Sequence, residues 1–384
     1  MHPLAAYFDV RRMLPAELKD RAAELPEGRS MYGEYIRLAL PSVAEMVLIS
    51  LINMMDTVMV SGLGTDAVAA VGLVGQPRLI MLSMFFALNT GITAVVARRR
   101  GEERQKDANT TVRTSVLLIL GLSFLLMAVL LPLAEPLMRF AGAEEGRTLE
   151  DAITYFNILG YALPFQAISM GLCAAQRGVG NTKLTMEVNI TSNLVNILFN
   201  WLLINGVGPF PRLGVRGAAI ATAIGLFVGF LLSVAAMLGG ERSGSFLTLS
   251  FRESWKPDRE AAGALVNVAS SAMVEQLAMR IGFFAYAKIV AGLGTDAFAA
   301  HQICCQFLNL SFSFADGLGI AGTSLVGQML GRRRPDLAHI YGTLAQRFSL
   351  MIGLVLASIC ILLRAPLVSM FISGDSTGVV RAMA

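Results

Sequence analysis

The sequence predicts an all-α membrane protein, because of its composition, its long apolar stretches and an internal repeat. Of its 384 residues, 55% are hydrophobic and only 15% are charged, whereas soluble domains carry about 25% charged residues. The mean hydropathy of +0.62 is correspondingly high. The 21 Phe, 20 Met and four Cys residues match neither a disordered chain nor a disulfide-stabilised one. Composition therefore excludes a soluble globular domain and favours a chain that crosses the membrane several times.

Nine stretches are long enough to cross the hydrocarbon core, which takes about 20 apolar residues in a helix. Four of them contain no Asp, Glu, Lys or Arg, and five contain isolated charges. The predicted spans are 38–60, 67–97, 114–134, 152–176, 188–211, 217–240, 265–291, 297–330 and 342–372. A helix is expected in each, with ends placed to within a few residues.

Lys and Arg residues gather in alternate loops, and loops of this kind stay in the cytoplasm. The N-terminal tail and the loops 98–106 and 332–334 are rich in them, whereas 61–66 and 292–296 contain none. We therefore expect a multi-pass protein of the plasma membrane (the inner membrane of a bacterium) with a cytoplasmic N-terminus. The formal charge of +4 is interpreted as loop charge, so no nucleic-acid partner is expected. Residues 1–34 contain no apolar segment like that of a signal peptide, so the first span should direct insertion.

Two copies of one segment lie 230 residues apart. Gly62–Ala70 reads GLGTDAVAA and Gly292–Ala300 reads GLGTDAFAA, which gives eight identities in nine positions. The same offset pairs Glu45 with Glu275 and Gly101 with Gly331. Six spans separate the copies, so the halves have the same orientation, as in transporters built from parallel repeats. Two unrelated hairpins that share a glycine-rich turn are the weaker alternative.

The repeat divides the chain into two unequal lobes. The predicted domains are a cytoplasmic tail (1–34), a lobe of six helices (35–240), a cytoplasmic linker (241–264) and a partial second lobe of three helices (265–384). The sequence stops where the second half should begin its fourth helix. Three further helices are therefore expected in a complete twelve-helix protein, of which this chain would be a fragment or a truncated variant.

The first span carries two carboxylates that share one face. Glu45 and Asp56 are 11 residues apart, which places them about 20° apart around a helix and about 16 Å apart along it. Asn53 lies one turn before Asp56 on that face. An unpaired carboxyl inside a span is a candidate site that takes up and releases a proton. An Asp neutralised by a permanent hydrogen-bond partner is the structural alternative.

Four asparagines form a stripe along the fifth span. Asn189, Asn193, Asn196 and Asn200 are spaced by four, three and four residues, so their amides lie on one helical face. Such a face lines a cavity or joins helices by hydrogen bonds. The stripe is expected to supply amide ligands beside Asp56, and the hydroxyl of Thr222 in the sixth span can complete the cluster.

The second half also places polar side chains within its spans. Glu275, Arg280 and Gln302 are candidate residues of a substrate path, together with Glu45, Asn189, Asn193 and Met55 of the first half. For Glu275 and Arg280 an internal ion pair with a structural role is an equal alternative. Met55 and its neighbouring methionines suit a pocket for varied apolar substrates, and they also suit packing against lipid. The four cysteines lie in apolar stretches without metal spacing, so no metal site is expected from them.

Four segments carry a family resemblance: PSVAEMVLISLINMMDTVMVSGLGTDAVAAVG, EQLAMRIGFFAYAKIVAGLGTDAFAAHQ, GTSLVGQMLGRRRPDLA and GVRGAAIAT. Together they resemble the MATE (multidrug and toxic compound extrusion) transporters, with a likeness to the DNA-damage-inducible protein F branch. The resemblance runs from about Tyr35 to the end of the chain. It implies two six-helix lobes in a V that opens to each side in turn, and export of cationic or amphipathic compounds in exchange for Na⁺ or H⁺.

The resemblance also assigns roles to residues. Asp56 matches the helix 1 acid that binds the coupling ion, while Asn196 and Thr222 match residues of helices 5 and 6 at that site. Asn200 stands where many members have an acid, so Asp56 is the only formal charge there, which favours H⁺ over Na⁺. Met279 stands near the position of a helix 7 Glu used by some members, which makes a cation site in the second lobe doubtful.

These observations predict an antiporter that exports small cationic or amphipathic compounds in exchange for H⁺, by rocker-switch alternating access. No cofactor is expected besides the coupling ion, no metal besides Na⁺ at Asp56, and no partner besides membrane lipid and small-molecule substrates, with a monomeric chain. A flippase for a lipid-linked precursor is one alternative, because Arg78, Arg280 and Lys288 could grip a phosphate. A truncated, non-transporting membrane protein is another. An enzyme is not expected, since both GLGTD copies lie in outer turns and no catalytic motif is present.

Overall fold

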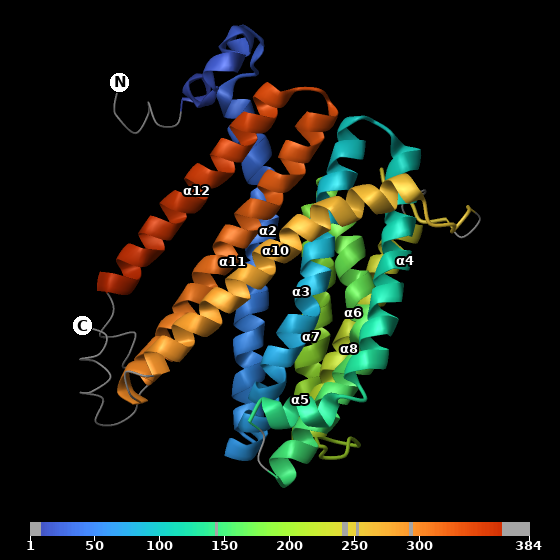
Figure 1. Ribbon diagram of the computed structural model, residues 1–384, viewed down its shortest axis with the longest axis vertical. Coiled ribbons are helices and arrows are strands. Elements are labelled where there is room, and N and C mark those ends of the chain that lie inside the picture. Colours follow the sequence, from blue (N-terminus) through green and yellow to red (C-terminus); the bar gives the residue numbers. More distant parts are fainter. Residues whose placement is uncertain (1–8, 143–144, 240–244, 251–252, 292–294, 363–384) are drawn as a thin grey trace.

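The computed structural model describes residues 9–142, 145–239, 245–250, 253–291 and 295–362, and within them the chain is helical apart from turns and short loops (Figure 1). Two short 3₁₀ helices come first, η1 (Val10–Met13) and η2 (Ala16–Glu24). The α-helices are α2 (Gly28–Ser61), α3 (Thr65–Gly101), α4 (Gln105–Leu130), α5 (Ala134–Phe140), α6 (Arg147–Gly178), α7 (Thr182–Asn205), α8 (Val215–Leu238), α10 (Arg259–Ala291), α11 (Thr295–Gly331) and α12 (Pro335–Leu362). The predicted all-α fold is confirmed.

Each of the nine predicted spans falls largely on one long helix of the described part of the chain. Six of these helices, α2, α3, α4, α6, α8 and α12, are long and apolar enough to cross a membrane by length and composition. The remaining three, α7, α10 and α11, have 24, 33 and 37 residues, which is also enough to cross at 1.5 Å per residue. The end of the last predicted span, beyond residue 362, lies outside the described residues.

The prediction for the fifth span was wrong by six residues at each end. It was placed at 188–211, whereas α7 covers Thr182–Asn205. The helix ends because Gly206 adopts the left-handed conformation, with a φ angle of 70°, and its N–H caps the helix by donating to the carbonyl of Leu202. A search for uncharged residues missed this end because 206–211 has no charge, although its glycines and prolines are typical of a turn.

The α3–α4 turn (102–104) and the α11–α12 turn (332–334) occupy equivalent positions in the two repeats and have the same backbone conformation. We call them the two repeat turns. Arg333 lies 230 residues after Glu103, and these are the only two described non-glycine residues with a positive φ angle, at 58° and 59°. The backbone hydrogen bonds around both turns follow the same pattern. The second copy of GLGTD falls partly on 292–294, outside the described residues. The internal repeat is thus visible in the backbone as well as in the sequence.

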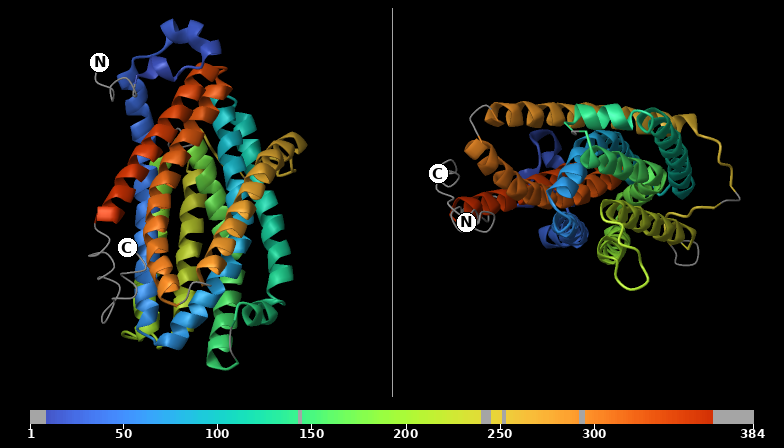
Figure 2. Two further views of the ribbon diagram at one scale, coloured as in Figure 1. Left: turned by 60° about the vertical axis from the view of Figure 1, so that its left-hand side comes forward. Right: turned by 90° about the horizontal axis from the view of Figure 1, so that it is seen from below.

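Both repeat turns lie at the same end of the bundle, where α2 begins (Figure 2). There α3 and α11 touch through Gly101 and Gly331. A Cβ atom added to Gly101 would lie 2.0 Å from the carbonyl oxygen of Gln328, and one added to Gly331 would lie 2.1 Å from that of Arg98. No side chain fits at either position, so two glycines permit this close approach.

The long helices bury three apolar cores. One joins α3, α4, α6 and the start of α10, and another joins α3, α5, α6 and α8 at the end where α2 finishes. The third joins the N-terminal segment and α2 to α11 and α12, with Val10, Met13 and Tyr35 buried in it. α2 packs against α7 on one side and against α11 on the other, and α10 crosses α3 obliquely (Figure 1). The bundle therefore brings α2, α7 and α8, which carry the predicted coupling residues, into one neighbourhood.

Candidate coupling site

Parallel helices α2 and α7 keep one register along their shared face. Three side-chain hydrogen bonds join residues that are 144 positions apart: Thr182 to the carbonyl of Leu38, Asn189 to Glu45, and Asn200 to Asp56. Glu45 and Asp56 share one face because their spacing of 11 residues is close to three helical turns. The asparagine stripe of α7 therefore meets both carboxylates of α2.

Asp56 is half-buried and is surrounded by amide groups. The amide of Asn200 donates to Oδ1 of Asp56 at 2.9 Å. The amide of Asn196 satisfies its neighbours when its nitrogen faces Asp56, donating to both carboxylate oxygens at 3.0 and 3.1 Å, while its oxygen accepts from the hydroxyl and the backbone N–H of Thr222, both at 3.1 Å. The two asparagines are 5% and 2% exposed. We call Asp56, Asn196, Asn200 and Thr222 the Asp56 site.

The Asp56 site contains no ion pair among the described residues. The side-chain amide oxygen of Asn200, Oδ1, is buried there and has no hydrogen-bond partner. Tyr155 of α6 lies near Thr222, and Arg78 of α3 is near enough to interact electrostatically with both Asp56 and Tyr155. Arg78 itself donates to Gln166 at 3.5 Å, and its Nε atom is buried without a partner. The carboxylate is thus held by neutral donors, with one cation at longer range.

Sequence reasoning did not single out Tyr155 or Gln166. Both belong to α6, which packs between α3 and α8. Neither is marked by charge or by periodicity, since one tyrosine and one glutamine in a long apolar helix are compatible with packing alone. Only the pairing of helices distant in sequence brings them next to Thr222 and Arg78.

Glu45 is fully buried in a separate cluster on the same face, nearer the start of α2. Its carboxylate accepts from Arg177 at 2.5 Å, from Asn189 at 2.6 Å and from the hydroxyl of Thr185 at 3.0 Å. Arg177 lies just beyond the predicted span 152–176, but in the structure it belongs to the last turn of α6 and its side chain is only 16% exposed. We call these four residues the Glu45 cluster.

The other predicted site residues lie elsewhere. Asn53 and Met55 are exposed on α2, and Glu275 is exposed on α10. Asn193 is half-buried, and its amide donates to the carbonyl of Asn189 at 2.8 Å. The side chain of Gln302 lies outside the described residues. The structure thus brings Asp56, Asn196, Asn200 and Thr222 together, whereas Asn53, Met55 and Glu275 lie on exposed parts of their helices.

The three basic residues considered above as candidates for binding a phosphate group come from two helices. Arg78 lies on α3, whereas Arg280 and Lys288 lie on α10. Arg280 is half-buried and its Nε atom has no hydrogen-bond partner, while Lys288 is exposed. Within the described part of the chain no group of three or more His, Cys, Asp or Glu residues is placed to hold a metal ion.

Comparisons with known proteins agree with this architecture. The MatE family model matches residues 41–202 and 271–384. The chain is 29% identical to a probable multidrug resistance protein NorM of Thermotoga maritima over 91% of this chain and 74% of that protein. It is 28% identical to the multidrug resistance protein PmpM of Pseudomonas aeruginosa, over 89% and 71%.

Solved structures show the same fold. An outward-facing multidrug resistance MATE family transporter of the MOP superfamily superposes with a TM-score of 0.83 at 24% identity, covering 91% of this chain and 76% of the other. A MOP superfamily transporter from Pyrococcus furiosus superposes with a TM-score of 0.82 at 25% identity, covering 90% and 75%. The family model covers well over half of the chain, so this protein belongs to the MATE family of membrane transporters.

Proposed function

We propose that this chain is a secondary active antiporter that exports small cationic or amphipathic compounds in exchange for protons, with Asp56 as the group that takes up and releases the proton. The family supports a transporter role, and its relatives NorM and PmpM bear the name multidrug resistance protein. The observation that carries the assignment is the Asp56 site itself: one carboxylate inside a membrane helix, held by amides from a second helix.

The donors around Asp56 support a proton over Na⁺. The amide nitrogen of Asn200 faces the carboxylate, and the amide of Asn196 satisfies its neighbours when its nitrogen does so too, whereas a bound cation requires oxygen atoms to face it. A carboxylate with neutral partners also changes charge without leaving a buried cation unpaired. The buried, unpartnered carbonyl oxygen of Asn200 is the feature that favours Na⁺, so the experiment includes both ions.

Rocker-switch alternating access requires contacts that close one end of the bundle and open again. The contacts between α11 and the helices α2 and α3 meet this need. They include the Gly101–Gly331 approach and a buried hydrogen bond from the hydroxyl of Tyr35 to the carbonyl of Leu318 at 3.0 Å. In the proposed cycle this arrangement is closed at that end, and protonation or deprotonation of Asp56 biases its opening.

The proposed orientation places this closed end in the cytoplasm. The arginines of the α3–α4 and α11–α12 turns lie there, together with the start of α2, and Lys and Arg near the ends of spans favour the cytoplasmic side. The chain would then be a monomer of the bacterial inner membrane with a cytoplasmic N-terminus. To test this orientation, exposed Arg29 is replaced by a single cysteine, which is treated with a membrane-impermeant thiol reagent. We expect the reagent to label this cysteine in inside-out vesicles but not in whole cells.

The test is drug-driven ion flux in vesicles that contain the purified chain and a pH-sensitive dye. Ethidium is added on one side, and the proton flux is measured in buffers with Na⁺ and with a large organic cation instead. The proposal expects proton flux in both buffers, loss of that flux in Asp56→Asn, and normal flux in Glu187→Gln, which removes an exposed carboxylate from α7. Flux that needs Na⁺ would assign the site to Na⁺, and unchanged flux in Asp56→Asn would refute the role of Asp56.

A further inference from the structure

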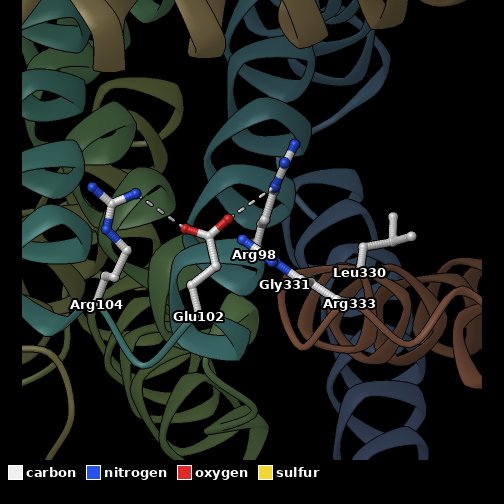
Figure 3. A pocket seen from close by; sticks show the side chains of 6 residues that line it. All are labelled: Arg98, Glu102, Arg104, Leu330, Gly331 and Arg333. Atoms are coloured by element: carbon white, nitrogen blue, oxygen red, sulfur yellow. Dashed lines mark hydrogen bonds and ion pairs between the residues drawn. The ribbon is translucent and has the colours of Figure 1, made fainter.

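A polar cavity lies where the two repeat turns meet. It has a volume of about 350 Å³ and is lined by Arg98, Glu102, Arg104, Leu330, Gly331 and Arg333 (Figure 3). The first three residues come from the end of α3 and the α3–α4 turn, and the last three from the end of α11 and the α11–α12 turn. The cavity is remote from the Asp56 site, since Asp56 lies near the opposite end of α2.

The cavity carries more positive than negative charge. Glu102 is its one acid, and it is shared by Arg98 at 3.2 Å, Arg104 at 3.5 Å and the neighbouring Arg99 at 3.4 Å. Arg333 forms no ion pair with any residue in the described ranges, and its side chain extends from its own turn toward the other one (Figure 3). The lining has three guanidinium groups and one carboxylate, and Asp107, which pairs with Arg104, reduces the surplus around the cavity to one positive charge.

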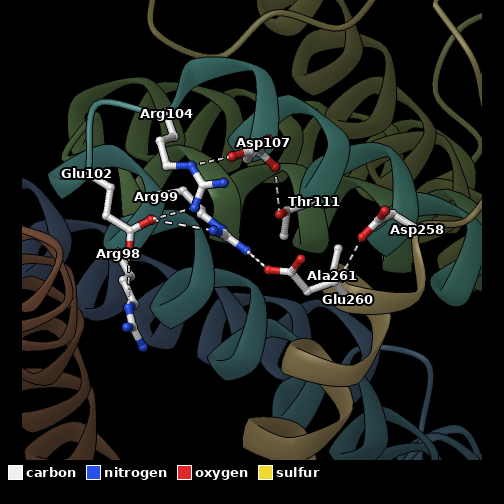
Figure 4. Close-up of polar contacts among 9 residues, drawn as sticks. All are labelled: Arg98, Arg99, Glu102, Arg104, Asp107, Thr111, Asp258, Glu260 and Ala261. Atoms are coloured by element: carbon white, nitrogen blue, oxygen red, sulfur yellow. Dashed lines mark hydrogen bonds and ion pairs between the residues drawn. The ribbon is translucent and has the colours of Figure 1, made fainter.

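Two of the cationic groups are held in place by their surroundings. Arg104 pairs with Asp107 at 2.6 Å in addition to Glu102, and Arg99 beside them pairs with Glu260 of α10 at 2.8 Å (Figure 4). These contacts fix the α3–α4 turn against α10. A guanidinium presents a planar set of donors that matches a phosphate group with two parallel hydrogen bonds. The cavity thus offers an anion the guanidinium donors of Arg98 and Arg104 on its α3 side and those of Arg333 on its α11 side.

The cavity exists only while the two turns touch. Its walls are joined at Gly101 and Gly331, where an added Cβ atom would lie about 2 Å from the opposing backbone. Separating α3 from α11 at this end moves Arg333 away from Arg98 and Arg104. A ligand that contacts both turns must therefore bind this closed arrangement more tightly than an open one, and it shifts the population accordingly.

We propose that this cavity binds a phosphate group and that binding stabilises the arrangement closed at this end. Under the orientation in the proposed function, this end faces the cytoplasmic leaflet, where anionic phospholipids supply such headgroups. Free phosphate has the same chemistry. The inference rests on the proposed orientation for the identity of the leaflet, but the binding site itself does not depend on transport.

Binding is tested on the full chain in neutral detergent, without substrate or ion gradient. Calorimetric titrations use short-chain phosphatidylglycerol, short-chain phosphatidylcholine and inorganic phosphate, all at one ionic strength because surface charges are screened by salt. The expected result is binding of phosphatidylglycerol but not of phosphatidylcholine. Binding of inorganic phosphate as well would identify free phosphate as a sufficient ligand, whereas its absence would identify the lipid headgroup. No binding of either anion overturns the proposal.

Variants locate the site. Arg333→Gln and Arg104→Gln should each raise the Kd for the anion about tenfold, as expected for the loss of one hydrogen bond to a charged group. Arg333→Lys keeps the charge but loses the planar fork, so its Kd should fall between those of the parent and the Gln variant. Arg29→Gln removes an exposed arginine near the same end and should leave the Kd unchanged. Equal Kd values for all four variants overturn the assignment to this cavity.

A further variant tests whether anion binding depends on the closed arrangement. Gly101→Val keeps every arginine but forces the two turns apart, so it should weaken the anion affinity as well. An unchanged Kd in Gly101→Val, measured on protein with an intact helical circular dichroism spectrum, overturns the conformational part. Since none of these measurements uses transport, failure of the antiport assay leaves their outcome unaffected, and the two proposals fail independently.

Discussion

Asn200 of α7 lies 144 residues after Asp56 of α2 and donates its amide to that carboxylate at 2.9 Å. The same offset joins Asn189 to Glu45, so two carboxylates stand in one register against one stripe of asparagines. They differ in charge balance, because Glu45 is paired with Arg177 and Asp56 has no ion pair among the described residues. Protonating Glu45 would leave a buried guanidinium unpaired, which is costly. Asp56 is therefore the carboxylate suited to a cycle of protonation.

Replacing Asn200 by Asp is expected to create a Na⁺ site. Two carboxylates in direct contact cannot both ionise unless a cation lies between them, and oxygen atoms replace the amide nitrogen that faces Asp56. Substrate export by Asn200→Asp in vesicles should therefore become dependent on Na⁺. The control is Asn193→Asp, about two helical turns from Asn200 on the same stripe, where Asn193 donates to the carbonyl of Asn189 instead of to Asp56. Na⁺ dependence in both variants, or in neither, would contradict this geometry.

Breaking the Glu45–Arg177 pair is expected to destabilise the protein. Removing one partner of a buried pair costs about 3–5 kcal/mol, because the other charge stays buried without a partner. Unfolding of Glu45→Gln and of Arg177→Met in detergent should show losses of this size, and the double variant Glu45→Leu/Arg177→Met should recover most of the stability.

The matched control is the pair between Lys183 and Glu187, whose side chains are 77% and 58% exposed at 3.7 Å. Exposed pairs contribute about 0–1 kcal/mol, so Lys183→Met should change the stability little. Equal losses for the buried and the exposed pair would show that burial of Glu45 is not what makes its pair costly to break.

The sequence predicted the helices because helices depend on local patterns, and the shared face of the asparagines in α7 depends on such a pattern too. Charge-free length marks a span, and the spacing of Asn196 and Asn200 marks a shared face, whatever lies opposite. The contact partners could not be predicted in the same way. Arg177 lies just beyond the predicted span 152–176, and only the approach of the end of α6 to Glu45 of α2 shows that it forms a buried ion pair. The end of α7 was misplaced because a glycine turn stops a helix without any change of charge.

The Tyr35 hydroxyl is expected to stabilise the closed arrangement. It is fully buried and donates across the bundle to the carbonyl of Leu318 on α11. A hydrogen bond of this kind contributes about 1 kcal/mol, so Tyr35→Phe should lower the ratio of closed to open molecules about fivefold. The ratio is measured by the distance between spin labels at exposed positions Lys106 and His339, in a background without native cysteines. Tyr161→Phe removes an exposed hydroxyl, and an equal shift in that variant would contradict the role of Tyr35.

Gly101→Ala is expected to have the larger effect on the same measurement. The added Cβ atom would lie 2.0 Å from the carbonyl oxygen of Gln328, and backbone atoms cannot move aside as the end of a side chain does. The helices α3 and α11 must therefore separate, and the label distance should lengthen in most molecules. Gly121→Ala on α4 is the control, since nothing lies within 4 Å of its added Cβ atom. Gly121→Ala should keep the label distance of the parent protein. If Gly101→Ala also kept it, the contact between the two repeat turns would not be what holds this end closed.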